Sequence, residues 1–316
     1  MKRLLLLAAA LLSAAPSFAQ YPGKPIRIVV PFPAGSATDT ITRILGQSVS
    51  AAVGQPVLVD NKVGADGAIA GAEVAKAAPD GYTVLMATNS PMAAVPAMKK
   101  TPPYDPVADF TPITDVGRYT FFLYVNAGLP IKTFAELIAY AKANPGRLNY
   151  ATGNTTGIVS FAQMNSLVGI DMTHVPYKGE PQGITDLVGG RVQVMWATPT
   201  TGLAHVKDGK LRAVATNLKA RSGLLPDVPT MVEVGVPQYS VVSWAALYGP
   251  AKLPRELQLR LNKEFTDAMK RPEVIAAMDK QAFPMTPSTP EDLAAFTKSQ
   301  MDAYRSILRA AGVQPE

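Results

Sequence analysis

The residues with the clearest chemistry in this sequence are small, hydroxylic and amide residues placed where a strand-like run gives way to a helix-like one. The stretch PFPAGSATDT occupies positions 31–40, directly after the apolar run 26–30. Ser36 is well placed to cap a helix, with Asp39 three residues later. The first backbone N–H groups of such a helix lack intrahelical acceptors and carry the positive end of its dipole. The stretch therefore predicts either a plain capped turn or a cradle for a carboxylate or phosphate.

Three further polar stretches also follow strand-like runs. ATGNTTG at 151–157 opens a second helix-like pattern, and its Asn154 can both donate and accept hydrogen bonds. ATNS at 87–90 and VPYKGE at 175–180 end two other runs. Since ligands of α/β proteins bind outside the carboxyl ends of the strands, four such loops shared between two sheets predict a cleft around a small ligand. The alternative is that they are ordinary connections of an α/β protein.

Single side chains near these loops allow more than one interpretation. Lys178 could be a counter-charge for an anion or a solvated lysine at a strand end. Trp196 closes the run that begins at Val192, and it could form a wall of the cleft or pack in the core. GADGAIAG at 64–71 lacks the dinucleotide spacing of glycines and indicates tight helix–sheet packing, with Asp66 near the cleft as a further option.

Signatures of catalysis are weak. The motifs G-x-S-x-G, H-E-x-x-H and G-x-x-x-x-G-K-[ST] do not occur. The absence of cysteine excludes disulfides, thiolate metal sites and a cysteine nucleophile. His174 lies between apolar neighbours, as core histidines do. These observations favour a binding protein without metal or cofactor. The alternative is an exported hydrolase or isomerase that uses Asp39 or His174.

Strand-like and helix-like segments alternate, which predicts an α/β fold with mostly parallel sheets and right-handed crossovers. Strands are expected at 26–32, 56–61, 82–88, 121–126, 148–152, 173–177, 192–197, 211–216 and 240–248. Helices are expected after the first strand, at 64–78, 133–143 and 158–168, and from Pro254 onward. Thr133 and Glu136 form a capping box at the start of one helix.

The two similar strand–loop–helix systems predict two lobes. The first comprises residues 20–122 and 245–316, and the second comprises 123–244. The strand pair 121–126 and 241–248 would carry the chain from one lobe to the other and back.

The first 19 residues have the pattern of a signal peptide. A positive start with Lys2 and Arg3 precedes an apolar stretch from Leu4 to Leu12, which is shorter than the roughly 20 residues of a membrane span. Small residues predict cleavage after Ala19 and export to the periplasm. The formal charge is +6, and no basic run is longer than Lys99-Lys100. Nucleic-acid binding is therefore not expected, whereas a mild positive excess suits an anionic ligand.

Long blocks of the sequence resemble one known family. YPGKPIRIVVPFPAGSATD, GQPVLVDNKVGADGAIAGAEVAKAAPDGYTVLMAT and HVPYKGEPQGITDLVGGRVQVMW are similar to the tripartite tricarboxylate transporter receptors, also called Bug proteins. The similarity runs from about Tyr21 to the C-terminus. It implies a periplasmic solute-binding protein of the two-lobed type II, or Venus flytrap, architecture. It also implies a monomer without catalysis, a small organic acid as ligand, and a tripartite membrane carrier or a sensor kinase as partner.

The resemblance also implies a set of ligand contacts in the loops. They are Phe32, Ala34, Gly35, Ser36, Thr38, Asp39, Asn89, Ser90, Thr152, Asn154, Thr155, Thr156, Tyr177, Lys178 and Gly179. Trp196 joins them as a candidate wall.

Two departures from the family pattern affect the expected ligand. Ser36 stands where relatives commonly have a second glycine, which adds a hydroxyl group and a Cβ. Trp196 and Ala197 stand where many relatives have an M-F-D run and therefore a carboxylate. Without that carboxylate, the sequence predicts a mono- or dicarboxylate ligand that lacks an amino group, with an aromatic or medium-chain acid favoured.

Overall fold

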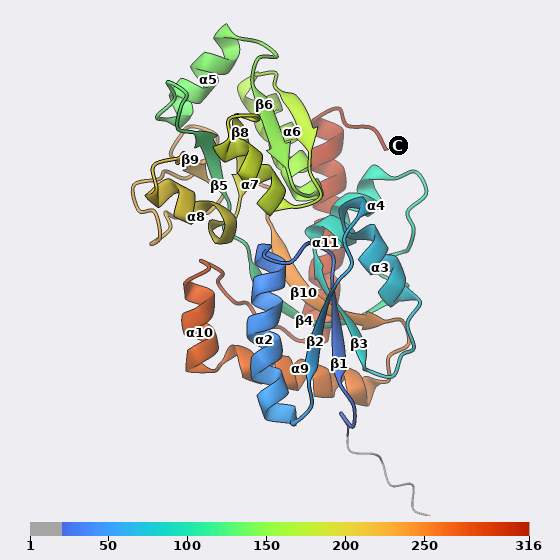
Figure 1. Cartoon of the computed structure of the whole chain (residues 1–316). Helices are drawn as coiled ribbons and strands as arrows, with labels where there is room; N and C mark the ends of the chain where they lie inside the picture. The colour runs from blue at the N-terminus through green and yellow to red at the C-terminus, as the bar shows by residue number, and fades with distance from the viewer. Residues whose placement is uncertain (1–20, 316) are drawn as a thin grey trace, which may run out of the picture.

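The fold consists of two α/β lobes, each built on a five-stranded sheet (Figure 1). The computed structural model describes residues 21–315. The first sheet has the order β2-β1-β3-β10-β4 and the second has the order β7-β6-β8-β5-β9. In each sheet one strand runs against its neighbours, β10 in the first and β5 in the second, while the other neighbouring pairs are parallel. This arrangement confirms the predicted two-lobed α/β architecture.

The strands of the first lobe are β1 (Ile26–Val30), β2 (Val57–Asn61), β3 (Thr83–Thr88), β4 (Phe110–Arg118) and β10 (Trp244–Pro250). Its helices are α2 (Ala37–Val53), η1 (Ala65–Gly67), α3 (Ala68–Ala75), η2 (Ser90–Ala94), α4 (Val95–Met98), α9 (Arg255–Met269), α10 (Pro272–Asp279) and α11 (Pro290–Ala310). The second lobe contains β5 (Phe122–Asn126), α5 (Phe134–Ala143), β6 (Asn149–Thr152), α6 (Thr155–Val168), β7 (Thr173–Pro176), α7 (Glu180–Val188), β8 (Val194–Ala197), α8 (Pro199–Lys207) and β9 (Leu211–Thr216).

The helix that follows β1 forms for the reasons that its sequence indicates. Ser36 is the N-cap of α2, and Gly54 ends the helix in the left-handed conformation at φ 69°. Ile41, Leu45 and Val49 repeat at helical spacing and are fully buried against the first sheet. Because α2 directly follows β1, its N-terminus lies at the carboxyl edge of that sheet.

Three element predictions need correction. The strand β4 was not predicted, because Pro112 and Gly117 interrupt its apolar pattern; its place at the edge of the sheet allows a proline there. Helix α6 begins at Thr155 rather than 158, because the Asn154 side chain caps it. Strand β10 begins at Trp244 rather than 240.

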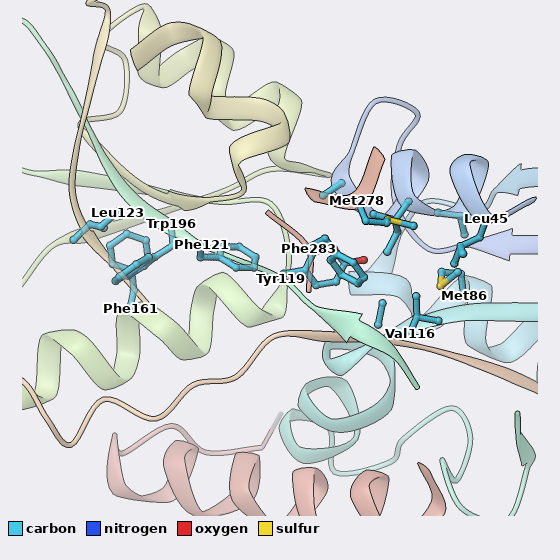
Figure 2. Packing of buried hydrophobic residues seen from close by; sticks show 14 of the residues in the cluster. Leu45, Met86, Val116, Tyr119, Phe121, Leu123, Phe161, Trp196, Met278 and Phe283 are labelled. Carbon is cyan, nitrogen blue, oxygen red and sulfur yellow. The ribbon is translucent and has the colours of Figure 1, made fainter. Parts of the chain in front are cut away.

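A continuous apolar core extends from one lobe to the other. Figure 2 shows Trp196, Phe161 and Leu123 on one side of Phe121 and Tyr119, and Phe283, Val116 and Met86 on the other. The Tyr119 ring lies 5.0 Å from that of Phe283 and 6.4 Å from that of Phe121, measured between centroids. Helix α11 also contacts both lobes, through β4 in the first and α6 in the second (Figure 1). The segments that connect the two lobes are therefore packed within a common apolar core.

We expect Gly117→Ala to destabilise the protein, because β4 meets the chain around Pro284 at this point. A Cβ on Gly117 would lie 2.5 Å from the carbonyl oxygen of Pro284, and backbone cannot move aside easily. Overpacking of this kind costs about 1–3 kcal/mol of unfolding free energy, which urea denaturation measures. Gly223→Ala is the matched control, because a Cβ there would meet nothing within 4 Å. Equal stability of the two variants would show that β4 is not packed as described.

Candidate functional site

A small cavity lies between the two lobes, and we call it the interlobe cavity. Its free volume is about 20 Å³, enough for about one water molecule or a group of similar size. The chain segments that line it come from the loops after β1, β3, β6, β7 and β8 and from the two passages between the lobes. The lining residues are Phe32, Ser36, Ala37, Thr38, Thr88, Tyr119, Phe121, Gly153, Asn154, Thr156, Glu180, Thr198 and Ser243.

The N-terminus of α2 supplies hydrogen-bond donors to the interlobe cavity. The Ser36 hydroxyl accepts a hydrogen bond from the Asp39 amide at 3.3 Å, and the Ser36 amide donates to the Pro33 carbonyl at 3.1 Å. Within residues 21–315, the amides of Ala37 and Thr38 have no acceptor. Both residues line the cavity, so two free donors and the positive end of a 17-residue helix adjoin this space.

The second lobe supplies a further donor from the start of α6. Asn154 is the N-cap, and its Oδ1 accepts a hydrogen bond from the Gly157 amide at 2.9 Å. Its Nδ2 has no acceptor among the described residues, although Asn154 lines the cavity. The side chain thus caps its own helix with one atom and can donate to a ligand with the other. Donors from both lobes therefore surround one small space, which is the arrangement that an anion requires.

Asp39 braces the loop after β1 and does not line the interlobe cavity. Its carboxylate accepts hydrogen bonds from the Gly35 amide at 3.0 Å, Asn61 Nδ2 at 2.9 Å and Arg43 Nε at 3.0 Å. Burial raises the pKa of Asp39, but the bonds from Arg43, Asn61 and Gly35 outweigh it, so the pKa is lowered overall.

Two other predicted contacts in this loop also lie away from the cavity. Gly35 adopts φ 79°, which suits glycine, and its amide is already used by Asp39. Ala34 and Gly35 are exposed and do not line the cavity. Of the contacts expected here, the structure brings Phe32, Ser36 and Thr38 to the cavity.

Asn89 and Ser90 join the lobes directly instead of lining the cavity. The Ser90 hydroxyl accepts a hydrogen bond from the Thr156 amide at 3.2 Å, and Asn89 Nδ2 bonds the Thr156 hydroxyl. Asn89 Oδ1 accepts hydrogen bonds from the Ser243 hydroxyl at 3.1 Å and the Trp244 amide at 3.2 Å. The bonds to Thr156 connect the end of β3 to the start of α6, so they form only when the lobes are close together.

Tyr177 and Lys178 line a second hollow of about 260 Å³. It adjoins the interlobe cavity, because Phe32 and Gly153 line both. The Tyr177 hydroxyl donates to Asp186 at 2.8 Å, and Lys178 is exposed. Gly179 packs so closely on Pro33 of the first lobe that a Cβ there would lie 2.6 Å from the proline ring. This hollow is therefore an outer compartment of the cleft.

Thr155 lines a third, mostly apolar hollow of about 730 Å³, together with Asp66 and His174. The predicted contact Thr152 is buried beside it, with its hydroxyl 2.7 Å from His174 Nε2. Burial lowers the pKa of His174, and the charge of Asp66 opposes that change. Neither Asp39 nor His174 reaches the interlobe cavity, so the geometry does not support the hydrolase or isomerase alternative.

The placement of Trp196 as a wall of the cleft is wrong. Its side chain is buried to 2% exposure and stacks on Tyr239 with 5.5 Å between ring centroids (Figure 2 shows it within the core). The aromatic residues that do line the interlobe cavity are Phe32, Tyr119 and Phe121.

The sequence also failed to identify Glu180, the first residue of α7. Glu180 lines the interlobe cavity, and the residue is 6% exposed. Burial raises the pKa of Glu180, while hydrogen bonds from Thr198 and Thr201 oppose that change. Glu180 therefore places a carboxyl group at the cavity, although Trp196 and Ala197 stand where many relatives have an aspartate. Other lining residues that sequence reasoning missed are Ala37, Thr88, Gly153, Thr198, Tyr119, Phe121 and Ser243; the last three lie on the two passages between the lobes.

Two α/β lobes joined by two chain passages, with a donor-lined cavity between them, define a solute-binding protein of the two-lobed type. The chain belongs to the tripartite tricarboxylate transporter receptor family, whose sequence profile matches residues 41–313. No helix of the described part of the chain has the length and apolar character needed to cross a membrane.

Comparison with known proteins supports this assignment along nearly the whole chain. Protein BugT of Bordetella pertussis is 32% identical over 300 residues, which cover 93% of this chain and 91% of BugT. The structure of Rpa4515 from R. palustris with adipate matches with a TM-score of 0.90 and 29% identity, over 94% of this chain and all of that one. MatC from Rhodopseudomonas palustris with bound malate matches with a TM-score of 0.86 and 27% identity, over 91% of this chain and all of MatC.

We expect Asp39→Asn to lower the unfolding free energy at pH 7 by about 1–2 kcal/mol, because Arg43 and the Gly35 amide lose a charged acceptor. The folded-state pKa of Asp39 is depressed, so its stabilisation is present above the unfolded pKa of about 4 and is lost as pH falls through the folded value. The difference between wild type and variant should therefore shrink below about pH 4.

Chemical denaturation of both proteins between pH 7 and pH 3 measures this difference. Asp227→Asn, an exposed carboxylate without a described partner, is the control and should change little. A difference that stays constant over the whole range would contradict the role assigned to Asp39.

Proposed function

We propose that this protein captures a small mono- or dicarboxylate in the interlobe cavity. One carboxylate group is held by the Ala37 and Thr38 amides of the first lobe and by Asn154 Nδ2 of the second. The observation that carries the proposal is the pair of unpaired α2 amides in a cavity that the second lobe closes. The relatives with adipate and malate support it, because both ligands are small carboxylates.

Binding is coupled to closure of the two lobes. A ligand shifts the equilibrium between open and closed forms only by its difference in affinity for the two, so it must touch both lobes. Donors from α2 and α6 meet this condition. The cavity of about 20 Å³ is too small for a ligand to enter without opening. The bonds between Ser90 and Thr156 would break on opening and re-form around the ligand.

We place the pivot of this motion at residues 119–121, between β4 and β5, and at residues 241–243, between β9 and β10. These boundaries are close to the lobes expected from sequence, 20–122 with 245–316 and 123–244. Tyr119, Phe121 and Ser243 lie on these passages and line the cavity. A ligand that contacts these residues would therefore couple its own binding to the angle between the two lobes.

The proposed location is the periplasm, as for the family's receptors, and the protein acts as a monomer. The signal peptide and its cleavage after Ala19 lie outside the described residues and stay predictions. The closed receptor then delivers its ligand to a tripartite membrane carrier or presents itself to a sensor kinase. A carrier or a kinase encoded next to this gene would distinguish the two.

We expect Asn154→Asp to weaken carboxylate binding at least about tenfold, measured by isothermal titration calorimetry with mono- and dicarboxylates. The aspartate keeps the oxygen that caps α6 but replaces the donor Nδ2 with a second negative oxygen, which repels an anionic ligand. Because the cap remains, thermal stability should stay close to wild type.

Asn144→Asp, at the C-cap of α5 and away from the cavity, is the matched control. The assignment of Asn154 is overturned if Asn154→Asp binds as tightly as wild type. The ligand class is overturned if wild-type protein, freed of bound ligand by unfolding and refolding, binds no mono-, di- or tricarboxylate.

A further inference from the structure

The interlobe cavity contains an acidic side chain as well as donors for an anion. Among the described residues that line it, Glu180 is the only one with an acidic or basic side chain, and the residue is 6% exposed. It belongs to the second lobe, while the unpaired Ala37 and Thr38 amides belong to the first. The interlobe cavity therefore has hydrogen-bond donors on the side of the first lobe and an acceptor on the side of the second.

One oxygen of Glu180 is fully used within the protein. Oε2 accepts hydrogen bonds from the Thr198 amide at 3.1 Å, the Thr198 hydroxyl at 2.6 Å and the Thr201 hydroxyl at 3.0 Å. These three donors fix the orientation of the carboxylate at the start of α8. Burial raises the pKa of Glu180, whereas these hydrogen bonds and the positive end of α8, whose N-cap is Thr198, favour its ionised form.

The other oxygen has no donor. Within residues 21–315, Glu180 Oε1 receives no hydrogen bond, although its residue lines the cavity. This oxygen is not among the buried acceptors that lack a partner, so it is accessible from the cavity, and a ligand that supplies a donor there gains a hydrogen bond to the carboxylate. A ligand that instead places a carboxylate there is repelled, and one that places an apolar group there removes water from this oxygen without replacing its hydrogen bond.

We propose that Glu180 determines specificity by accepting a hydrogen bond from an ammonium or hydroxyl group that the ligand carries beside the carboxylate bound by α2. The inference rests on the proposed function and narrows its ligand class. Because the cavity measures only about 20 Å³, the donor group must lie within a few atoms of that carboxylate, as on the adjacent carbon. It replaces the expectation of a ligand without an amino group.

The first test compares three acids with one carbon skeleton. Succinate, 2-hydroxysuccinate and 2-aminosuccinate differ only in carrying hydrogen, hydroxyl or ammonium on the carbon next to a carboxylate. Propionate, 2-hydroxypropionate and 2-aminopropionate form a shorter set. Isothermal titration of wild-type protein should show that a donor-bearing acid binds at least about tenfold more tightly than its unsubstituted counterpart, as expected for a hydrogen bond to a charged group.

The second test exchanges the acceptor for a donor without changing shape. In Glu180→Gln the donors from Thr198 and Thr201 should retain the amide oxygen, so the amide nitrogen takes the position of Oε1 in the cavity. The preference for the donor-bearing acid over the unsubstituted acid should then fall to within about twofold, or reverse. The unsubstituted acid should still bind. Glu256→Gln, an exposed glutamate of α9, is the matched control and should keep the wild-type preference.

The outcomes separate the two proposals. If no acid of either set binds wild type, the proposed function fails and this inference fails with it. If unsubstituted and donor-bearing acids bind wild type equally, the inference alone is overturned, whether or not Glu180→Gln folds. If Glu180→Gln folds and keeps a tenfold preference, the donor group is recognised elsewhere and the inference is likewise overturned.

Discussion

The interaction on which the site depends is the pair of unpaired amides at the start of α2. A helix of 17 residues begins at the carboxyl edge of the first sheet, and its Ala37 and Thr38 N–H groups lack acceptors among the described residues. Leaving such donors buried is costly unless something accepts their hydrogen bonds. The loop before α2 is consequently built to hold this end in place, with Asp39 tied to Arg43 and Asn61. In the function proposed here, a ligand carboxylate accepts both hydrogen bonds, and closure of the second lobe excludes water from them.

The second lobe contributes in two distinct ways. Asn154 adds a donor from the start of α6, while Glu180 adds the opposite kind of group from the start of α7. Both are positioned by bonds within their own lobe, to Gly157 and to Thr198, and so are preorganised before closure. The apolar core continues from one lobe to the other through Tyr119 and Phe121 (Figure 2).

The sequence was sufficient for the architecture but only partly for the site. Strand–loop–helix order and the Ser36 cap predicted where donors would gather. The i,i+4 spacing of Asp39 and Arg43 is visible in the sequence, but the bond from Asn61 that also ties Asp39 to its own loop arises only through the fold. The sequence also could not show toward which face of the sheet the Trp196 side chain points. Alternate residues of a strand point to opposite faces, and Trp196 shares with Val194 the face that packs in the main core, while Ala197 lies on the other.

The central claim is that the α2 amides bind the ligand's carboxylate, and amide chemical shifts test it most directly. A titration of ¹⁵N-labelled protein with succinate or 2-hydroxysuccinate, followed by ¹H–¹⁵N correlation spectra, reports on each backbone N–H separately. The account predicts that the Ala37 and Thr38 amide protons shift downfield as they gain a charged acceptor. It would be contradicted if the acid binds but these two signals stay unchanged while those around the hollow beside His174 move.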